Sequence, residues 1–286
     1  MSAGQSVPAR MPAWRLAGLT ALALTAFAGN SLLCRAALRD TAIDPTSFTL
    51  VRLAAGAAVL AMLVGLRHPQ ALRSGSWASG LALFGYAIGF SWAYTGLSAG
   101  TGALILFGAV QASMIGWGLL RGERLAITQW LGLLLAVAGL VGLLLPGLSA
   151  PPLQPALMML AAGVCWGVYS LRGRTGGDPT AATAGNFLRA LPFALLASAL
   201  MFAEARIDSA GLWLAIASGA LTSGLGYAVW YRVLPVLRAS SAATLQLSVP
   251  VLTALAGVVL LAEPLGLRLV LASLAVLGGI ALVLRR

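Results

Sequence analysis

The feature that most constrains this chain is a series of long apolar stretches separated by short loops. About twenty helical residues cross the hydrocarbon core of a bilayer, and this criterion predicts ten spans. They are expected at 14–34, 46–66, 77–97, 101–120, 125–145, 154–171, 181–203, 211–230, 241–261 and 265–284. The chain is 60% hydrophobic and only 9% charged, with a mean hydropathy of +0.94, so lipid must be the solvent for most of it. We therefore predict an all-α polytopic membrane protein with ten transmembrane helices.

The first apolar stretch also imitates a secretory signal peptide. Arg10 and Arg15 precede it, and the sequence "AFA" at 26–28 resembles a cleavage site. The apolar run nevertheless continues through Leu33, which is long enough to span the membrane. We expect a retained first helix.

The arginines between the spans predict the orientation of the chain. With a cytoplasmic N-terminus, the inside segments hold Arg10, Arg15, Arg67, Arg73, Arg121, Arg124, Arg172, Arg174, Arg232, Arg238, Arg285 and Arg286. The outside segments hold only Arg35, Arg39, Arg206 and Arg268. This asymmetry is typical of a bacterial inner-membrane protein with both termini cytoplasmic. It also explains the net charge of +11 without a nucleic-acid partner, and it leaves His68 in a basic surface loop.

Two short patterns recur in the two halves of the chain. Asp-Pro-Thr begins at Asp44 and again at Asp178, and one constant offset pairs Glu123 with Glu263. Five helices per half would place the second copy upside down relative to the first, as an inverted repeat. We therefore expect repeats at 1–148 and 149–286, joined by the segment "PGLSAPPLQP" at 146–155.

Several residues have expected roles in the helical scaffold. Glu123 and Glu263 lie at tight turns, where each carboxylate would complement the N-terminal end of the following helix, with direct coupling to transport as the alternative role. Two stripes of small residues would allow close helix packing; they are Gly108, Ala112, Gly116 and Gly132, Ala136, Gly139. Pro250 is expected to interrupt the ninth span and to widen a pocket or form a hinge there.

The sequence resembles the EamA branch of the drug/metabolite transporter superfamily. The resemblance is carried by "TGALILFGAVQASMIGWGLLRGERL" (101–125) and "SAATLQLSVPVLTALAGVVLLAEPLGLRLVLASLAVLGGIALVL" (241–284). Within that branch it is most similar to YddG-type amino-acid exporters. The resemblance implies alternating access around a mid-membrane site built from the first, third, fourth, sixth, eighth and ninth helices. The first half departs from the family pattern at 109–111, where the second half has Pro250.

The distribution of acidic, histidine and cysteine residues argues against catalysis and metal binding. No acidic residue lies in the middle of a predicted span, and Cys34 and Cys165 both lie in apolar segments. An enzyme would need a constellation of His, acid or Cys side chains at a reachable depth, so we expect no enzyme, no cofactor and no metal site. Without a carboxylate at mid-depth, exchange and facilitated diffusion remain open beside proton antiport.

Neutral polar and aromatic side chains are the candidates for a substrate site. Amides and hydroxyls in lipid cost free energy unless they face partners or water, so mid-span amides either join helices or line a cavity. Rings at helical spacing line a cavity or form interfacial belts. The candidate site residues are Asn30, Tyr86, Phe90, Tyr94, Phe107, Gln111, Trp166, Tyr169, Tyr227 and Gln246. Arg52 and Arg189, within spans, are expected to snorkel or pair locally, with a substrate carboxylate as the alternative partner.

Together these features predict an exporter of small neutral or zwitterionic metabolites, foremost amino acids with apolar or aromatic side chains. Amides would bind the charged head and rings would receive the tail. The alternatives are another metabolite or a lipophilic drug as cargo, or a membrane scaffold that transports nothing. The expected partners are a small-molecule substrate and the lipid bilayer, and the chain is expected to be a monomer or a weak homo-oligomer.

Overall fold

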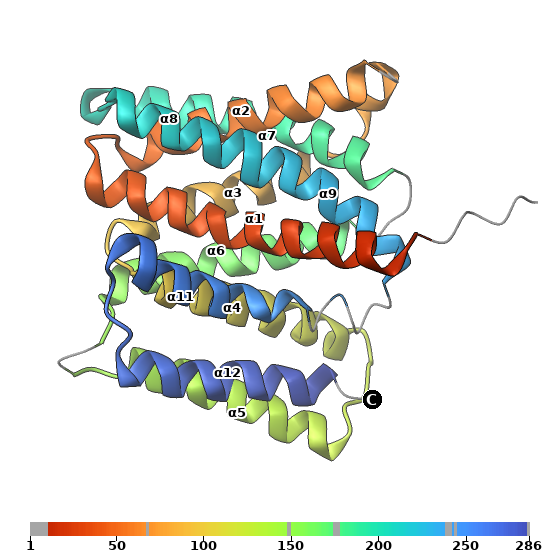
Figure 1. Ribbon diagram of the computed structural model, residues 1–286, viewed down its shortest axis with the longest axis vertical. Helices are drawn as coiled ribbons and strands as arrows, with labels where there is room; N and C mark the ends of the chain where they lie inside the picture. The colour runs from red at the N-terminus through yellow and green to blue at the C-terminus, as the bar shows by residue number, and fades with distance from the viewer. Residues whose placement is uncertain are drawn as a thin grey trace, which may run out of the picture.

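The computed structural model describes residues 11–66, 69–147, 150–173, 178–237, 242 and 245–284, and within these ranges every regular element is a helix. Figure 1 shows the long helices lying side by side, with α1 beginning and α12 ending at the same end of the bundle. The helices are α1 (Ala13–Asp40), α2 (Pro45–Gly65), η1 (Pro69–Arg73), α3 (Trp77–Tyr94), α4 (Ala99–Leu120), α5 (Ile127–Leu144), α6 (Leu153–Arg172), α7 (Pro179–Leu200), η2 (Phe202–Glu204), α8 (Ser209–Ala217), the π-helix η3 (Ser218–Leu225), α9 (Gly226–Val233), η4 (Leu234–Val236), α11 (Ser248–Leu261) and α12 (Leu267–Leu284). Several expectations concern residues outside the described ranges, namely His68, the 148/149 repeat boundary, and Arg10, Arg67, Arg174, Arg238, Arg285 and Arg286.

The all-helical membrane fold predicted from hydropathy is confirmed. Eight described helices are long and apolar enough to cross a membrane, when α8 to η4 are taken as one span over Ser209–Val236. The other two predicted spans correspond to α3, which is rich in Gly, Ser and aromatic residues, and to α11, which has 14 residues. Two boundaries were wrong: α1 continues to Asp40 and the eighth span to Val236, so Arg35, Arg39 and Arg232 lie in helices and not in loops.

The repeated Asp-Pro-Thr is a repeated helix start. Oδ1 of Asp44 accepts hydrogen bonds from the backbone N–H groups of Thr46 and Ser47, both at 2.9 Å. Oδ1 of Asp178 accepts one from Thr180 N at 2.8 Å. Each aspartate therefore caps a helix, α2 or α7, whose first turn holds the proline, where its missing N–H costs nothing.

Close packing through glycine is confirmed for α5 and wrong for α4. A methyl group on Gly139 would lie 2.6 Å from Cβ of Ala275, and one on Gly279 would overlap the backbone of Ala136. The antiparallel helices α5 and α12 therefore touch almost backbone to backbone, as the pair at the lower edge of Figure 1. Gly116 has no atom within 4 Å of such a methyl group, so the predicted stripe on α4 does not mediate close packing.

Glu263 complements a different helix from the one predicted. Its Oε2 accepts a hydrogen bond of 2.7 Å from the backbone N–H of Ala99, the first residue of α4. The expected contact was with α12, which follows Glu263 in the sequence. The carboxylate still satisfies a positive helix N-terminus, but that terminus belongs to the other half of the chain.

Candidate functional site

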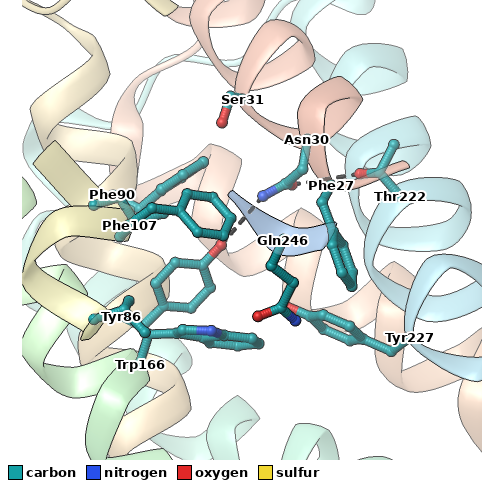
Figure 2. A pocket seen from close by; sticks show the side chains of 12 residues that line it. Phe27, Asn30, Ser31, Tyr86, Phe90, Phe107, Trp166, Thr222, Tyr227 and Gln246 are labelled. Atoms are coloured by element: carbon teal, nitrogen blue, oxygen red, sulfur yellow. Dashed lines mark hydrogen bonds between the residues drawn. The ribbon is translucent and has the colours of Figure 1, made fainter. Parts of the chain in front are cut away.

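A small cavity lies in the middle of the bundle, among side chains from six of the predicted spans. Its volume is about 40 Å³, which accommodates a few water molecules and is too small for an aromatic amino acid. Figure 2 shows Gln246 among the rings that surround it. The lining residues are Phe27, Asn30 and Ser31 of α1, Tyr86 and Phe90 of α3, Leu106, Phe107 and Val110 of α4, Trp166 of α6, Thr222 of η3, Tyr227 of α9, and Gln246.

The structure brings most of the candidate residues to this cavity and leaves three outside its lining. Those that line it are Asn30, Tyr86, Phe90, Phe107, Trp166, Tyr227 and Gln246. Tyr94 is fully buried behind Phe90, with ring centroids 4.7 Å apart, and its hydroxyl donates to Ala99 O. Tyr169 packs against Trp166 at 5.2 Å, and Gln111 is buried one helical turn beyond Phe107.

Aromatic rings form a continuous wall of the cavity. The Tyr86 and Trp166 centroids lie 4.7 Å apart, and Trp166 stacks on Tyr227 at 5.4 Å with an interplanar angle of 21°. Phe27 packs against Tyr227 at 5.7 Å, and Tyr86 against Phe90 at 5.3 Å. These distances suit favourable ring pairs, so the rings hold one another in place and present a rigid apolar surface.

Asn30 organises the polar side of the cavity. Its Nδ2 donates to the hydroxyl of Tyr86 at 3.2 Å, and its Oδ1 accepts from Ser218 Oγ at 2.8 Å and from Thr222 Oγ1 at 3.4 Å. Thr222 gives its hydroxyl hydrogen mainly to the carbonyl of Ser218, at 2.7 Å, so the donor that assigns the amide oxygen is Ser218 Oγ, and the NH₂ end is assigned to the side of Tyr86. This network connects α1, α3 and the π-helix η3.

Arg52 lies behind the same tyrosine. Its Nη2 donates to Tyr86 OH at 3.0 Å and its Nε to Ser223 Oγ at 3.4 Å, and its guanidinium carbon lies 4.9 Å from the centre of the Phe90 ring. The side chain is only 2% exposed. Arg52 therefore pairs locally and does not snorkel.

The other intramembrane arginine has a different environment. Arg189 donates to the backbone carbonyls of Ser74 at 2.7 Å, Arg73 at 2.8 Å and Gly185 at 2.8 Å. It therefore pairs locally, at the start of α3. Asn186 nearby accepts a hydrogen bond from Ser76 N at 2.9 Å, so this amide joins helices and does not line the cavity.

The π-helix η3 supplies polar groups that residue-by-residue reasoning missed. Thr222 lines the cavity, Ser218 binds Asn30 and Ser223 binds Arg52. Single π-helical turns within α-helices often occur at functional sites. The signal in the sequence was the concentration of small and hydroxyl residues in "SGALTSG" (218–224), in the middle of an apolar span. Phe27, Ser31, Leu106 and Val110 were also missed, because nothing in their spacing separates them from core residues.

The ninth span is interrupted between Gln246 and Pro250. The ninth span is helical at Gln246, forms a turn at Leu247 and begins again as α11 at Ser248. A proline ring clashes with the carbonyl four residues earlier, which is that of Gln246. The predicted interruption is therefore confirmed, and it lies directly beside a residue that lines the cavity.

The comparisons with known proteins agree with this architecture. A sequence model of the EamA-like transporter family matches the chain twice, over 15–145 and 153–285. The uncharacterized protein PA1977 of Pseudomonas aeruginosa is 60% identical over 275 residues, which are 96% of each chain. An uncharacterized transporter of Archaeoglobus fulgidus is 46% identical over 68 residues, which are 24% of this chain and 25% of that one.

A solved crystal structure has the same fold. It superposes with a TM-score of 0.66 at 22% sequence identity and covers 93% of this chain and 97% of that one. Within the described residues, no group of three or more His, Cys, Asp or Glu side chains is placed to hold a metal ion. Because the family match covers nearly the whole chain, the protein belongs to the EamA-like transporter family of the drug/metabolite transporter superfamily, and it is a transporter and not an enzyme.

Proposed function

We propose that this protein exports small zwitterionic metabolites, foremost amino acids with apolar or aromatic side chains, across the bacterial inner membrane. The observation that carries the proposal is the cavity in the middle of the bundle, with amides and hydroxyls beside a wall of rings. Asn30, Gln246 and Thr222 would bind the charged head of the substrate, and Trp166 and Tyr227 would receive its side chain. This division of the lining is the chemistry that a zwitterion with an apolar tail needs.

Alternating access follows from an inverted repeat of the two halves, 1–148 and 149–286. Three pairs of equivalent helices contact each other, α2 with α7, α4 with α11 and α5 with α12. In this division α3 is equivalent to the segment α8–α9, and α1 is equivalent to α6. The contact of α3 with α6 is matched by the contact of α8–α9 with α1, as a two-fold relation between the halves requires. Any two-fold relation between the halves gives such exchanged contacts, and with five spans in each half the axis of that relation would lie in the membrane plane. The double match of the family model supports the same division.

Rocking of the halves would enlarge the cavity. At about 40 Å³ it holds only a few waters, so a bound amino acid requires the side chains on α1, α6 and α9 to separate. The interruption before Pro250 and the π-helix η3 are the irregular segments next to the cavity. Both are natural positions for such a movement.

The direction of transport and the orientation rest on the sequence. The excess of arginines on one side favours cytoplasmic termini, and the start of α1 and the end of α12 lie at the same end of the bundle. The similarity to YddG-type exporters favours export of amino acids.

Uptake by proteoliposomes tests the proposed function. Purified protein in liposomes loaded with unlabelled phenylalanine should accumulate external labelled phenylalanine by exchange, whereas liposomes without protein should not. A panel of the other amino acids and lipophilic cations then defines the cargo. Accumulation of cations without amino acids would identify a drug exporter, and a complete lack of flux would favour a scaffold.

A further inference from the structure

Arg52 is a buried cation without a carboxylate partner. Its side chain is 2% exposed, and its Nη1 is buried without a hydrogen-bond partner. All seven acidic residues of the chain are described, and the two ion pairs among the described residues are Arg35–Glu263 and Arg39–Asp40. A buried charge in a membrane span is costly unless something compensates it. The hydrogen bonds to Tyr86 and Ser223 and the contact with the Phe90 ring compensate part of this cost, but all three partners are neutral, so the site has room for a counter-charge from a ligand.

The acids are placed where none of them can reach Arg52. Asp44, Asp178 and Asp208 cap the starts of α2, α7 and α8. The other four lie at helix ends or in turns; they are Asp40, Glu123, Glu204 and Glu263. The cavity beside Arg52 is thus lined by neutral side chains only, and Arg52 is a positively charged side chain that contacts two of them, Tyr86 and Phe90.

Tyr86 connects Arg52 to the cavity through a hydrogen bond. Its hydroxyl oxygen accepts two hydrogen bonds, from Arg52 Nη2 at 3.0 Å and from Asn30 Nδ2 at 3.2 Å. Two accepted bonds occupy both lone pairs of a phenol oxygen, so its own hydrogen can only donate. No acceptor for that hydrogen is found among the described residues, and Tyr86 lines the cavity. The O–H is therefore a donor without a partner, strengthened by the cation behind it.

We propose that Tyr86, backed by Arg52, recognises a carboxylate of the substrate. The carboxylate would accept the Tyr86 hydrogen and supply the counter-charge that the protein does not provide. No acidic side chain lines the cavity to pair with an ammonium group, so the amino group of an amino acid would contribute little. The site would thus accept monocarboxylates with an apolar tail and reject the corresponding amines. The inference rests on the proposed function, because it takes this cavity as the substrate site.

Three probes with the same aromatic tail separate the two charges. Phenylalanine carries both, 3-phenylpropionate only the carboxylate and phenethylamine only the ammonium group. Each is tested at pH 7 as a competitor of labelled phenylalanine exchange in proteoliposomes and for its effect on the melting temperature of the protein. We expect 3-phenylpropionate to compete within a few-fold of phenylalanine, and phenethylamine to be at least about tenfold weaker, the loss typical of a missing hydrogen bond to a charged group.

Two variants assign the effect to Tyr86. Tyr86→Phe removes the donor and keeps the ring, and it should weaken competition by 3-phenylpropionate about tenfold while leaving that by phenethylamine unchanged. Tyr231→Phe is the matched control, because Tyr231 packs on Tyr227 outside the cavity lining, and it should preserve the order of the probes. Arg52→Gln should also abolish the preference; if it does not fold, the probe series on the unchanged protein and on Tyr86→Phe decides.

The outcomes distinguish the inference from the function. If phenylalanine is exchanged but phenethylamine competes as well as 3-phenylpropionate, carboxylate recognition is overturned and amino-acid transport stands. An unchanged preference in Tyr86→Phe likewise overturns the role of this tyrosine. If phenylalanine is not exchanged and no probe shifts the melting temperature, the proposed function fails and the inference fails with it.

Discussion

The carboxylate of Glu263 lies 2.9 Å from Nε of Arg35, although 228 positions separate the two residues in sequence. Arg35 also donates to the carbonyl of Tyr94 at 2.9 Å, and the second oxygen of Glu263 accepts the backbone N–H of Ala99 at 2.7 Å. One ion pair therefore joins the ends of α1 and α3 to the start of α4 and to the turn before α12. Glu123, its counterpart in the first half, is exposed in the turn between α4 and α5, which lies at the opposite end of the bundle from the turn between α11 and α12 (Figure 1).

This asymmetry predicts different effects for the same substitution at the two glutamates. Glu263→Gln should lower the free energy of unfolding by about 2 kcal/mol, because it weakens hydrogen bonds to a charged and mostly buried group. Glu123→Gln should change it by less than about 0.5 kcal/mol, as an exposed substitution. Thermal unfolding of both variants in detergent measures the difference. Equal losses of unfolding free energy would show that the two glutamates stabilise their turns to the same extent.

The helix cap at Asp44 predicts a dependence of stability on pH. Burial raises the pKa of Asp44, but hydrogen bonds from the side chain of Ser47 and from the backbone of Arg206, Ser47 and Thr46 outweigh it and hold the pKa below its usual value. A carboxyl group with a depressed pKa in the folded state stabilises the protein above its unfolded pKa, near 3.9, and this stabilisation is lost as the pH falls through the folded pKa.

Two substitutions separate the cap of Asp44 from its charge. Asp44→Ala should cost about 1–2 kcal/mol near neutral pH. Asp44→Asn retains a capping oxygen and should cost less, while its melting temperature should fall less than that of the unchanged protein between pH 5 and 3, roughly the range of carboxylate titration. If the melting temperature falls equally with pH in Asp44→Asn and in the unchanged protein, the charge of Asp44 is excluded as the source of the pH dependence.

Adjacent glycines on α12 provide a matched test of its contact with α5. A methyl group on Gly279 would overlap the backbone of Gly132 and Ala136, whereas one on Gly278 would meet no atom within 4 Å. Gly279→Ala should destabilise the protein by about 1–3 kcal/mol through overpacking. Gly278→Ala should be neutral or gain up to about 1 kcal/mol of helix propensity. Thermal unfolding decides, and a loss in both variants would mean that helix packing is not the cause.

The two mid-span glutamines should behave differently in binding. Gln246 lines the cavity and Gln111 does not, so Gln246→Leu should weaken substrate affinity by about 1–3 kcal/mol, the loss expected for a missing polar partner. Gln111→Leu should leave affinity unchanged and alter stability by roughly 0.6 kcal/mol, as for a polar contact between helices. Competition assays with phenylalanine, paired with melting curves, separate the effects. Weaker binding in Gln111→Leu alone would move the site toward the end of α4.

Reporter fusions test the proposed orientation. A fusion after Arg286 should report a cytoplasmic location and one in the 146–155 joint a periplasmic location. Five spans separate the cytoplasmic N-terminus from the joint, and five more separate the joint from the C-terminus. A periplasmic signal at the C-terminus would contradict cytoplasmic termini and, with them, the direction assigned to export.

The sequence by itself determined the membrane fold and the start of several helices. Hydropathy is a sum over about twenty neighbouring residues, so apolar spans are readable without knowledge of their partners. The caps at Asp44 and Asp178 are equally local, because a capping side chain binds the backbone two or three residues away. The interruption before Pro250 follows from the clash of a proline with its own helix.

Only the tertiary structure decided which polar groups meet. Helical spacing placed Gln111 and Gln246 at similar depths, but Gln246 lines the cavity and Gln111 does not. The rotation of each helix about its axis decides this, and that rotation is set by the neighbouring helices. Glu263 found α4 and Arg35 instead of α12, and Arg52 joined Tyr86 across helices. Such contacts depend on how whole helices pack, and in a chain this apolar the local pattern carries little information about which face turns inward.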